Sequence, residues 1–140
     1  MRANTFGFYA INGNSVVDFK KNSKKEDVCE FLETIRDNNP GKRIIIVLDN
    51  FKSHHAKMTI AKAKDLDEVL VFLPPYSPDL NPIEFIWKSI KRVISAIFVV
   101  SVEHLKTTIR EAFIRRSRSL SYAEKWVNTF LGEGAKSLLV

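Results

Sequence analysis

Apolar residues in this chain occur either in short uninterrupted runs or at helical spacing. Residues 44–48 (IIIVL) and 69–73 (VLVFL) are apolar throughout, as expected of strands that are covered on both faces. The segment between them, about 53–64, has apolar residues at helical spacing. A strand, a helix and a second strand in this order predict a βαβ unit, in which the two strands are parallel.

A hairpin pattern precedes this unit, and helical patterns surround it. The runs at 5–11 and 15–19 are rich in aromatic and apolar residues, and Asn12-Gly13 between them predicts a β-hairpin. Further helices are predicted from Ser23 to about 37, from 82 to about 97, and over about 101–131. Residues 1–140 are therefore expected to form a single α/β domain, with its core at about 5–99 and C-terminal helices at about 101–131.

Composition excludes several classes of protein. The chain has 140 residues, of which 45% are hydrophobic and 27% charged, which is ordinary for a globular protein. No apolar run approaches the ~20 residues of a membrane span, so no membrane partner is expected. The single cysteine excludes an internal disulfide and fits a reducing compartment.

Nucleotide-binding glycine motifs and zinc-ligand spacings are absent from the sequence. The net charge of +6 suggests a polyanionic partner.

Two acids follow the two predicted parallel strands. Asp49 ends the first strand, and Glu84 lies in the first turn of the helix after the second strand. Because ligands bind beyond the carboxyl ends of such strands, the two carboxylates are expected at one sheet edge, where they suit a divalent cation. Each has a structural alternative. Asp49 can accept hydrogen bonds within its turn, and Glu84 can close a capping box that Asn81 opens.

Other polar residues lie close to these acids in the sequence. His54, in the first turn of the helix after Asp49, can contact a phosphate or hydrogen-bond a carboxylate, or simply begin a helix half-exposed. Lys88, Lys91 and Arg92 follow Glu84 by one to two helical turns. They can bind DNA phosphates, or form an ordinary solvated helix face in which Lys88 pairs with Glu84.

The two segments LDNFKSHH (48–55) and LPPYSPDLNPIEFIWKSIK (73–91) resemble the catalytic domain of DDE-type transposases, in the mariner-related insertion-sequence group. The 34 residues between Asp49 and Glu84 match that family's spacing between its second and third acids. The resemblance implies an RNase H-like mixed sheet with flanking helices. Asp49 and Glu84 would then be catalytic and hold Mg²⁺ or Mn²⁺, two ions in the complete site. Asn50 and His54 match the motif residues near the second acid.

The resemblance also implies a function and its partners. The family cleaves DNA strands and transfers them to a new site, so transposon ends and target DNA are the expected partners. Lys88, Lys91 and Arg92 are the DNA-binding candidates. The expected location is the prokaryotic cytoplasm, in association with the nucleoid.

One part of the family pattern is absent from this sequence. The family's first acid lies on a strand before the hairpin, whereas only Met1 to Asn4 precede the hairpin here, without a carboxylate. That strand lies between the hairpin and the 44–48 strand, so its absence would leave two strand edges unpaired. We expect a transposase fragment that is inactive until a first acid is supplied, by a homodimer partner, another transposase chain or a complementing fragment. The alternative is a catalytically dead remnant that binds DNA or pairs with a transposase.

Overall fold

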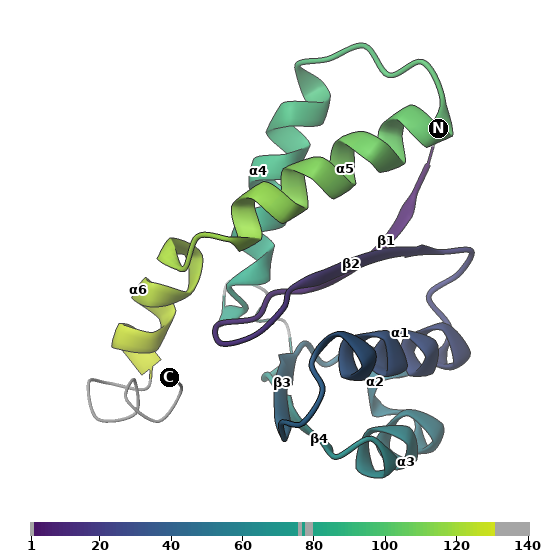
Figure 1. Ribbon diagram of the computed structural model, residues 1–140, viewed down its shortest axis with the longest axis vertical. Coiled ribbons are helices and arrows are strands. Elements are labelled where there is room, and N and C mark those ends of the chain that lie inside the picture. Colours follow the sequence, from purple (N-terminus) through teal and green to yellow (C-terminus); the bar gives the residue numbers. More distant parts are fainter. Residues whose placement is uncertain (1, 76, 78–79, 131–140) are drawn as a thin grey trace.

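The computed structural model describes residues 2–75, 77 and 80–130 (Figure 1). The elements in chain order are β1 (Asn4–Phe8), β2 (Val16–Lys20), α1 (Lys25–Asn38), β3 (Ile44–Leu48), α2 (Lys52–His55), α3 (Lys57–Asp65), β4 (Glu68–Phe72), α4 (Ile83–Ser95), α5 (Val102–Ser117) and α6 (Ser121–Phe130). Among these helices, none is both long and apolar enough to cross a membrane. The predicted end of the last helix, Leu131, lies outside the described residues.

The predicted βαβ unit is confirmed. β3 and β4 are parallel, with Ile44 opposite Glu68. β4 therefore begins one residue before the predicted strand. The connecting segment forms two helices instead of one, because the extended ψ of 142° at Ala56 interrupts it. Ser53, where the predicted helix begins, lies within α2, and its hydroxyl donates a hydrogen bond to the Ser23 carbonyl (2.8 Å).

The predicted hairpin is also confirmed. β1 and β2 are antiparallel, with Phe8 opposite Val16. Their connection is longer than a two-residue turn, and it is tied to the end of α1. The Asn39 side chain accepts a hydrogen bond from the Asn14 amide (2.7 Å) and donates one to the Asn14 carbonyl (3.0 Å). Tertiary contacts, in addition to the Asn-Gly pair, therefore fix this loop.

The hairpin lies between two hydrophobic cores, because side chains alternate between the faces of a strand. Phe6, Phe8 and Val16 contact one core, which buried residues of α1 and β3 dominate. Val17 and Phe19 contact the second core, which buried residues of α4 and α5 form. Figure 1 shows the hairpin with α4 and α5 on one side and α1 on the other.

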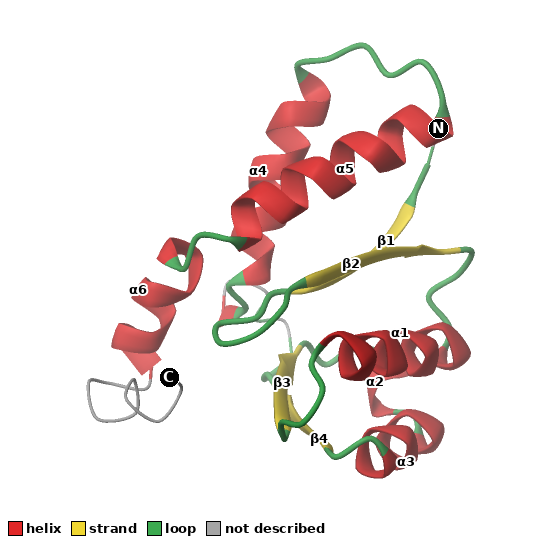
Figure 2. Ribbon diagram, viewed as in Figure 1, coloured by secondary structure: helices red, strands yellow, loops and turns green. Residues whose placement is uncertain are grey.

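The strands form two separate sheets. Among the described residues, β1 is hydrogen-bonded to β2 alone and β3 to β4 alone. Figure 2 shows the two pairs as distinct groups of yellow arrows. The mixed sheet expected from the sequence, in which the central strand is lacking, is divided between β1 and β3 among the described residues, and a cavity of about 580 Å³ lies at this division.

Gly7 allows α4 to approach the hairpin closely. A Cβ atom at Gly7 would contact Cζ2 of Trp87, and it would lie 2.6 Å from Cη2 of Trp87 and 3.1 Å from Cδ1 of Ile83. We expect Gly7→Ala to lower the free energy of unfolding by about 1–3 kcal/mol, the usual cost of overpacking, in urea denaturation. Gly7→Ala should cost less stability in a Trp87→Phe background, because the smaller ring leaves space for the added Cβ atom. An equal loss in both backgrounds would contradict this account of Gly7.

Candidate metal and nucleic-acid site

Asp49 lies directly after β3, at the carboxyl end of the parallel pair. Its side chain is about half exposed (52%). Its Oδ1 atom accepts a hydrogen bond from the Phe51 amide (3.1 Å), so the turn interaction expected for an aspartate at this position is present. Among the described residues, its Oδ2 atom has no protein partner and is available to a ligand.

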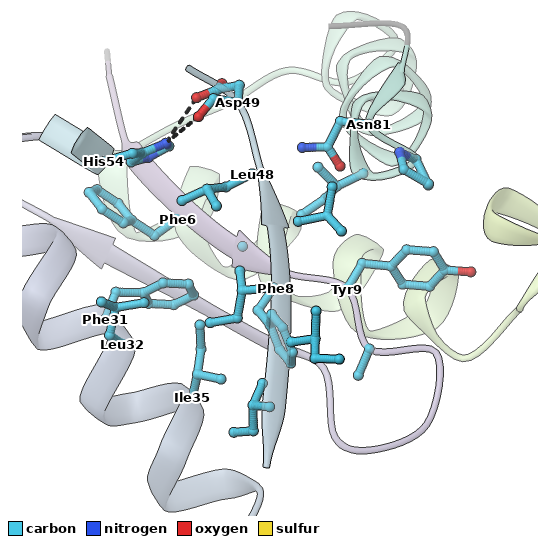
Figure 3. A pocket seen from close by; sticks show the side chains of 18 of the residues that line it. Phe6, Phe8, Tyr9, Phe31, Leu32, Ile35, Leu48, Asp49, His54 and Asn81 are labelled. Atoms are coloured by element: carbon cyan, nitrogen blue, oxygen red, sulfur yellow. Dashed lines mark hydrogen bonds and ion pairs between the residues drawn. The ribbon is translucent and has the colours of Figure 1, made fainter. Parts of the chain in front are cut away.

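His54 makes the second contact with Asp49. Its Nδ1 atom is 2.9 Å from Oδ1 of Asp49 and 3.3 Å from the Asp49 carbonyl oxygen (Figure 3). The ring also packs edge-on against Phe51, with ring centroids 5.7 Å apart. Of the roles predicted for His54, the geometry therefore supports the hydrogen bond to a carboxylate. Asn50, the other residue expected near the site, is exposed beside Asp49.

Glu84 lies in the first turn of α4 and is partly buried. The predicted capping box is wrong. The helix begins after Pro82, without a side-chain cap, and the Glu84 amide donates to the main-chain oxygen of Asn81 (3.0 Å). The predicted i,i+4 ion pair with Lys88 is likewise not formed. In the part of the chain that is described, the carboxylate therefore has no structural partner.

Electrostatics connect Glu84 with Asp49. Burial raises the pKa of the Glu84 carboxyl, and the negative charge of Asp49 raises it further, while Lys91 and Lys88 lower it. Both acids line the cavity of about 580 Å³. Two carboxylates that repel one another across a partly desolvated site favour a cation between them, and their oxygens are the ligands that Mg²⁺ and Mn²⁺ prefer.

The acidic ligand set is small. In the described ranges, no group of three or more His, Cys, Asp or Glu side chains could hold a metal ion. Asp49 and Glu84 fit a divalent cation by their chemistry, but two carboxylates are fewer than such an ion usually requires from its surroundings.

Three basic side chains extend the site along α4. Lys88, Lys91 and Arg92 are exposed, and none pairs with an acid among the described residues. Lys88 lies over the ring of Phe85, with its Nζ atom 5.5 Å from the centroid. Lysines and arginines that lack an acidic partner are suited to phosphate oxygens.

The sequence did not indicate that residues of the hairpin line the same cavity as the two acids. Thr5 to Phe8 of β1 line the same cavity as the two acids, as does Trp87. The helical spacing of Trp87 indicated only a core residue. The sequence predicted unpaired edges at the hairpin and at the 44–48 strand, but which side chains line the cavity between them depends on how α1 and α4 pack.

Replacement of Asp49 by asparagine is expected to lower the pKa of Glu84 towards its usual value, because a neighbouring negative charge is removed. The burial contribution should remain, so the shift should be partial. NMR titration of the Glu84 side-chain carboxyl carbon measures this change. Asp37→Asn, at an exposed position on α1, serves as the control. An unchanged Glu84 titration in Asp49→Asn would contradict the proximity of the two acids.

Comparison with known proteins places the chain in a family. A family model described as DDE superfamily endonuclease matches residues 1–106. No curated protein sequence matches the chain. The crystal structure of the catalytic domain of Mos1 mariner transposase is similar, with a TM-score of 0.62 and 17% identity, covering 91% of this chain and 79% of that one. The structure of the Mos1 catalytic domain with raltegravir and Mg has a TM-score of 0.61 and 17% identity, with 91% and 81% covered. The predicted RNase H-like fold class is thereby confirmed.

Proposed function

The chain belongs to the DDE superfamily of endonucleases. On this premise we propose that it is a mariner-related transposase and that Asp49 and Glu84 are its second and third catalytic acids. The reaction is divalent-metal-dependent cleavage of a DNA strand followed by strand transfer. The substrate is DNA, as transposon ends and target.

The observation that carries this proposal is the convergence of two carboxylates on one cavity. They come from the end of β3 and the start of α4, and each has oxygen atoms that no described protein group uses. The structural alternative for Glu84 is weakened, because Glu84 neither caps α4 nor pairs with Lys88. Since a partly buried carboxylate is costly without a partner, the presence of Glu84 at this position favours a ligand-binding role.

Each polar group has a task in this proposal. Asp49 and Glu84 hold the cation, and His54 fixes the orientation of Asp49 through Oδ1, leaving Oδ2 free. A bound Mg²⁺ or Mn²⁺ supplies charge neutralisation and an activated water or hydroxyl at the phosphate. Lys88, Lys91 and Arg92 bind the DNA backbone beside the acids.

The site acts only when a further acid is supplied. Two carboxylates leave the metal ligands among the described residues incomplete, so we infer that these residues are inactive without a further acid from outside them. A second candidate, a DNA-binding or transposase-pairing remnant without catalysis, rests on the same incomplete ligand set together with the unpaired basic side chains of α4.

Binding of Mn²⁺ tests the metal site without requiring catalysis. Because Mn²⁺ is paramagnetic, sub-stoichiometric Mn²⁺ should broaden the NMR amide signals of Asp49, Asn50 and Glu84 before others. The double variant Asp49→Asn/Glu84→Gln should lose this selective broadening. Glu103→Gln, which changes an exposed acid in the first turn of α5, should retain it. Selective broadening at other residues, or broadening unchanged in the double variant, would refute this metal site.

A further inference from the structure

We propose that the exposed connection between α4 and α5 is an apolar wedge that inserts Phe98 between base pairs of duplex DNA bound along α4. Because the ligand is DNA, this inference rests on the proposed function. It adds a contact to the bases, whereas the basic residues of α4 are assigned only to phosphates. The wedge does not involve the metal ligands.

The connection exposes apolar side chains at its tip. Phe98 is 85% exposed and Val100 67%, and Ile97 and Val102 beside them are also exposed. Phe98 is the most exposed of the large apolar side chains in the described part of the chain. Figure 1 shows the connection at the end of α4 that is remote from β3 and β4. Neighbouring exposed apolar residues mark an interaction surface.

Hydrogen bonds and one inward side chain hold the connection in place. The Ile97 amide donates to a carbonyl in the last turn of α4 (3.3 Å), and the Val100 amide donates to Nδ1 of His104 in the first turn of α5 (3.2 Å). Val99 packs against the core that α4 and α5 form. Phe98 is therefore presented to solvent by a fixed backbone, which lowers the entropic cost of binding.

A row of basic side chains leads along α4 from Glu84 to the connection. Lys88 and Lys91 follow Glu84 by four and seven residues, so the three lie on one face of the helix. Both lysines lower the pKa of Glu84, as cations near a carboxylate do. Ser95, the last residue of α4, continues this row, while the opposite face of the helix is buried in the core. A basic face thus joins the acidic site to the apolar tip.

The length of this face corresponds to a short stretch of duplex DNA. Ser95 follows Glu84 by eleven residues, which at about 1.5 Å per residue place it about 17 Å along the helix. At about 3.4 Å per base pair, DNA held at the acids reaches the tip after about five base pairs. Phe98, just beyond Ser95, lies where it can enter the stack. Phenylalanine is one of the apolar residues that proteins insert between base steps.

Two other occupants fit this surface less well. A second copy docked through the same tip would bring Lys91 and Arg92 of both chains together, and like charges oppose such a contact. An anionic membrane would attract these cations, but Glu84, the unpartnered acid on the same row, has no use there. Glu103, the acid beside the tip, lies 3.9 Å from Lys106, which offsets its charge towards phosphates. DNA fits both parts of the surface, with phosphates for the cations and base faces for the aromatic ring.

Relaxation of plasmid DNA by a topoisomerase, with the full chain bound in a metal-free buffer, tests the proposal. A side chain inserted between base pairs unstacks and untwists the duplex, so the chain should shift the distribution of topoisomers. Phe98→Ala should abolish this shift and weaken binding to a short duplex by about fivefold or more, the effect of losing one stacking contact. The salt dependence of binding should stay the same, because no phosphate contact is lost. Phe98→Trp should retain the shift.

A matched control and a stability measurement separate this effect from misfolding. Ile60→Ala changes an apolar residue of α3 that is 48% exposed, and it should alter neither the topoisomers nor the affinity. Because Phe98 is largely exposed, Phe98→Ala should leave the Tm unchanged.

The outcomes decide between the wedge and its alternatives. Bound chain that leaves the topoisomers unshifted, or a shift that Phe98→Ala retains, would overturn the wedge. So would dimerisation, or binding to vesicles of phosphatidylcholine and phosphatidylglycerol, that is lost in Phe98→Ala, since the tip would then serve that partner. Absence of all DNA binding would overturn the wedge and the proposed substrate together. Because metal is absent, the wedge and the Mn²⁺ site can fail independently.

Discussion

Replacement of Glu84 by glutamine is expected to lower metal-dependent nicking of plasmid DNA by more than about 100-fold, in an assay where a transposase fragment supplies the further acid. Changes at residues that merely orient metal ligands cost about 10–100-fold, so loss of a ligand should exceed this range. Asp49→Asn should have an effect of similar size. The measurement is the rate of conversion of supercoiled to nicked plasmid in Mg²⁺ or Mn²⁺, with a chelator as the blank.

Glu103→Gln is the matched control for this prediction. Glu103 also lies in the first turn of a helix, and its side chain is 85% exposed, so nicking should be unchanged. If Glu84→Gln nicks DNA as fast as the unmodified chain, Glu84 is not a catalytic acid. If the complemented chain does not nick DNA at all, the non-catalytic alternative is favoured. Lys91→Ala/Arg92→Ala should then weaken DNA binding and reduce its salt dependence.

Replacement of Glu68 by glutamine is expected to stabilise the chain at pH 8 and to change little at pH 4. Glu68 is the first residue of β4 and is only 4% exposed, and neither carboxylate oxygen has a hydrogen-bond partner among the described residues. Burial raises the pKa of Glu68 to about 7 from an ordinary 4.5, although the nearby Arg36 opposes the shift. The Arg36 guanidinium donates to the carbonyls of Leu66 and Asn39 and forms no hydrogen bond with Glu68.

The sign of the pH dependence follows from this raised pKa. The folded state binds the Glu68 proton more tightly than the unfolded state, so the contribution of Glu68 to stability is greatest below pH 4.5, falls as the pH rises, and levels off above pH 7. The rise of the pKa from 4.5 to about 7 corresponds to about 3 kcal/mol, the expected gain in stability of Glu68→Gln at pH 8. Urea denaturation of both proteins at pH 4 and pH 8 measures this difference. An equal difference at the two pH values would show that ionisation of Glu68 has no part in stability.

Local patterns predicted the strand bounds of β3, the hairpin and the parallel pair, because these depend on short apolar runs and a turn motif. Capping was predicted less well. At the start of α1 the Lys24 amide donates a hydrogen bond to the Asp27 carboxylate (3.0 Å), one position after Ser23, where the helix was predicted to begin. Several neighbouring polar residues are able to cap the same helix start, and tertiary contacts determine which of them does so. Here the Ser23 hydroxyl bonds to Asn4 of the hairpin.

The sequence by itself determined the family, the α/β fold class and the position of Asp49 and Glu84 after two parallel strands, since motif spacing and apolar runs are local properties. Only the tertiary structure decided that His54 contacts Asp49, that Glu84 does not cap its helix and that Glu68 is buried. It also decided that the edges of β1 and β3, which the sequence predicted to be unpaired, border a cavity of about 580 Å³ that both acids line. Each of these facts depends on which distant segments pack together, and residues adjacent in sequence do not encode that packing.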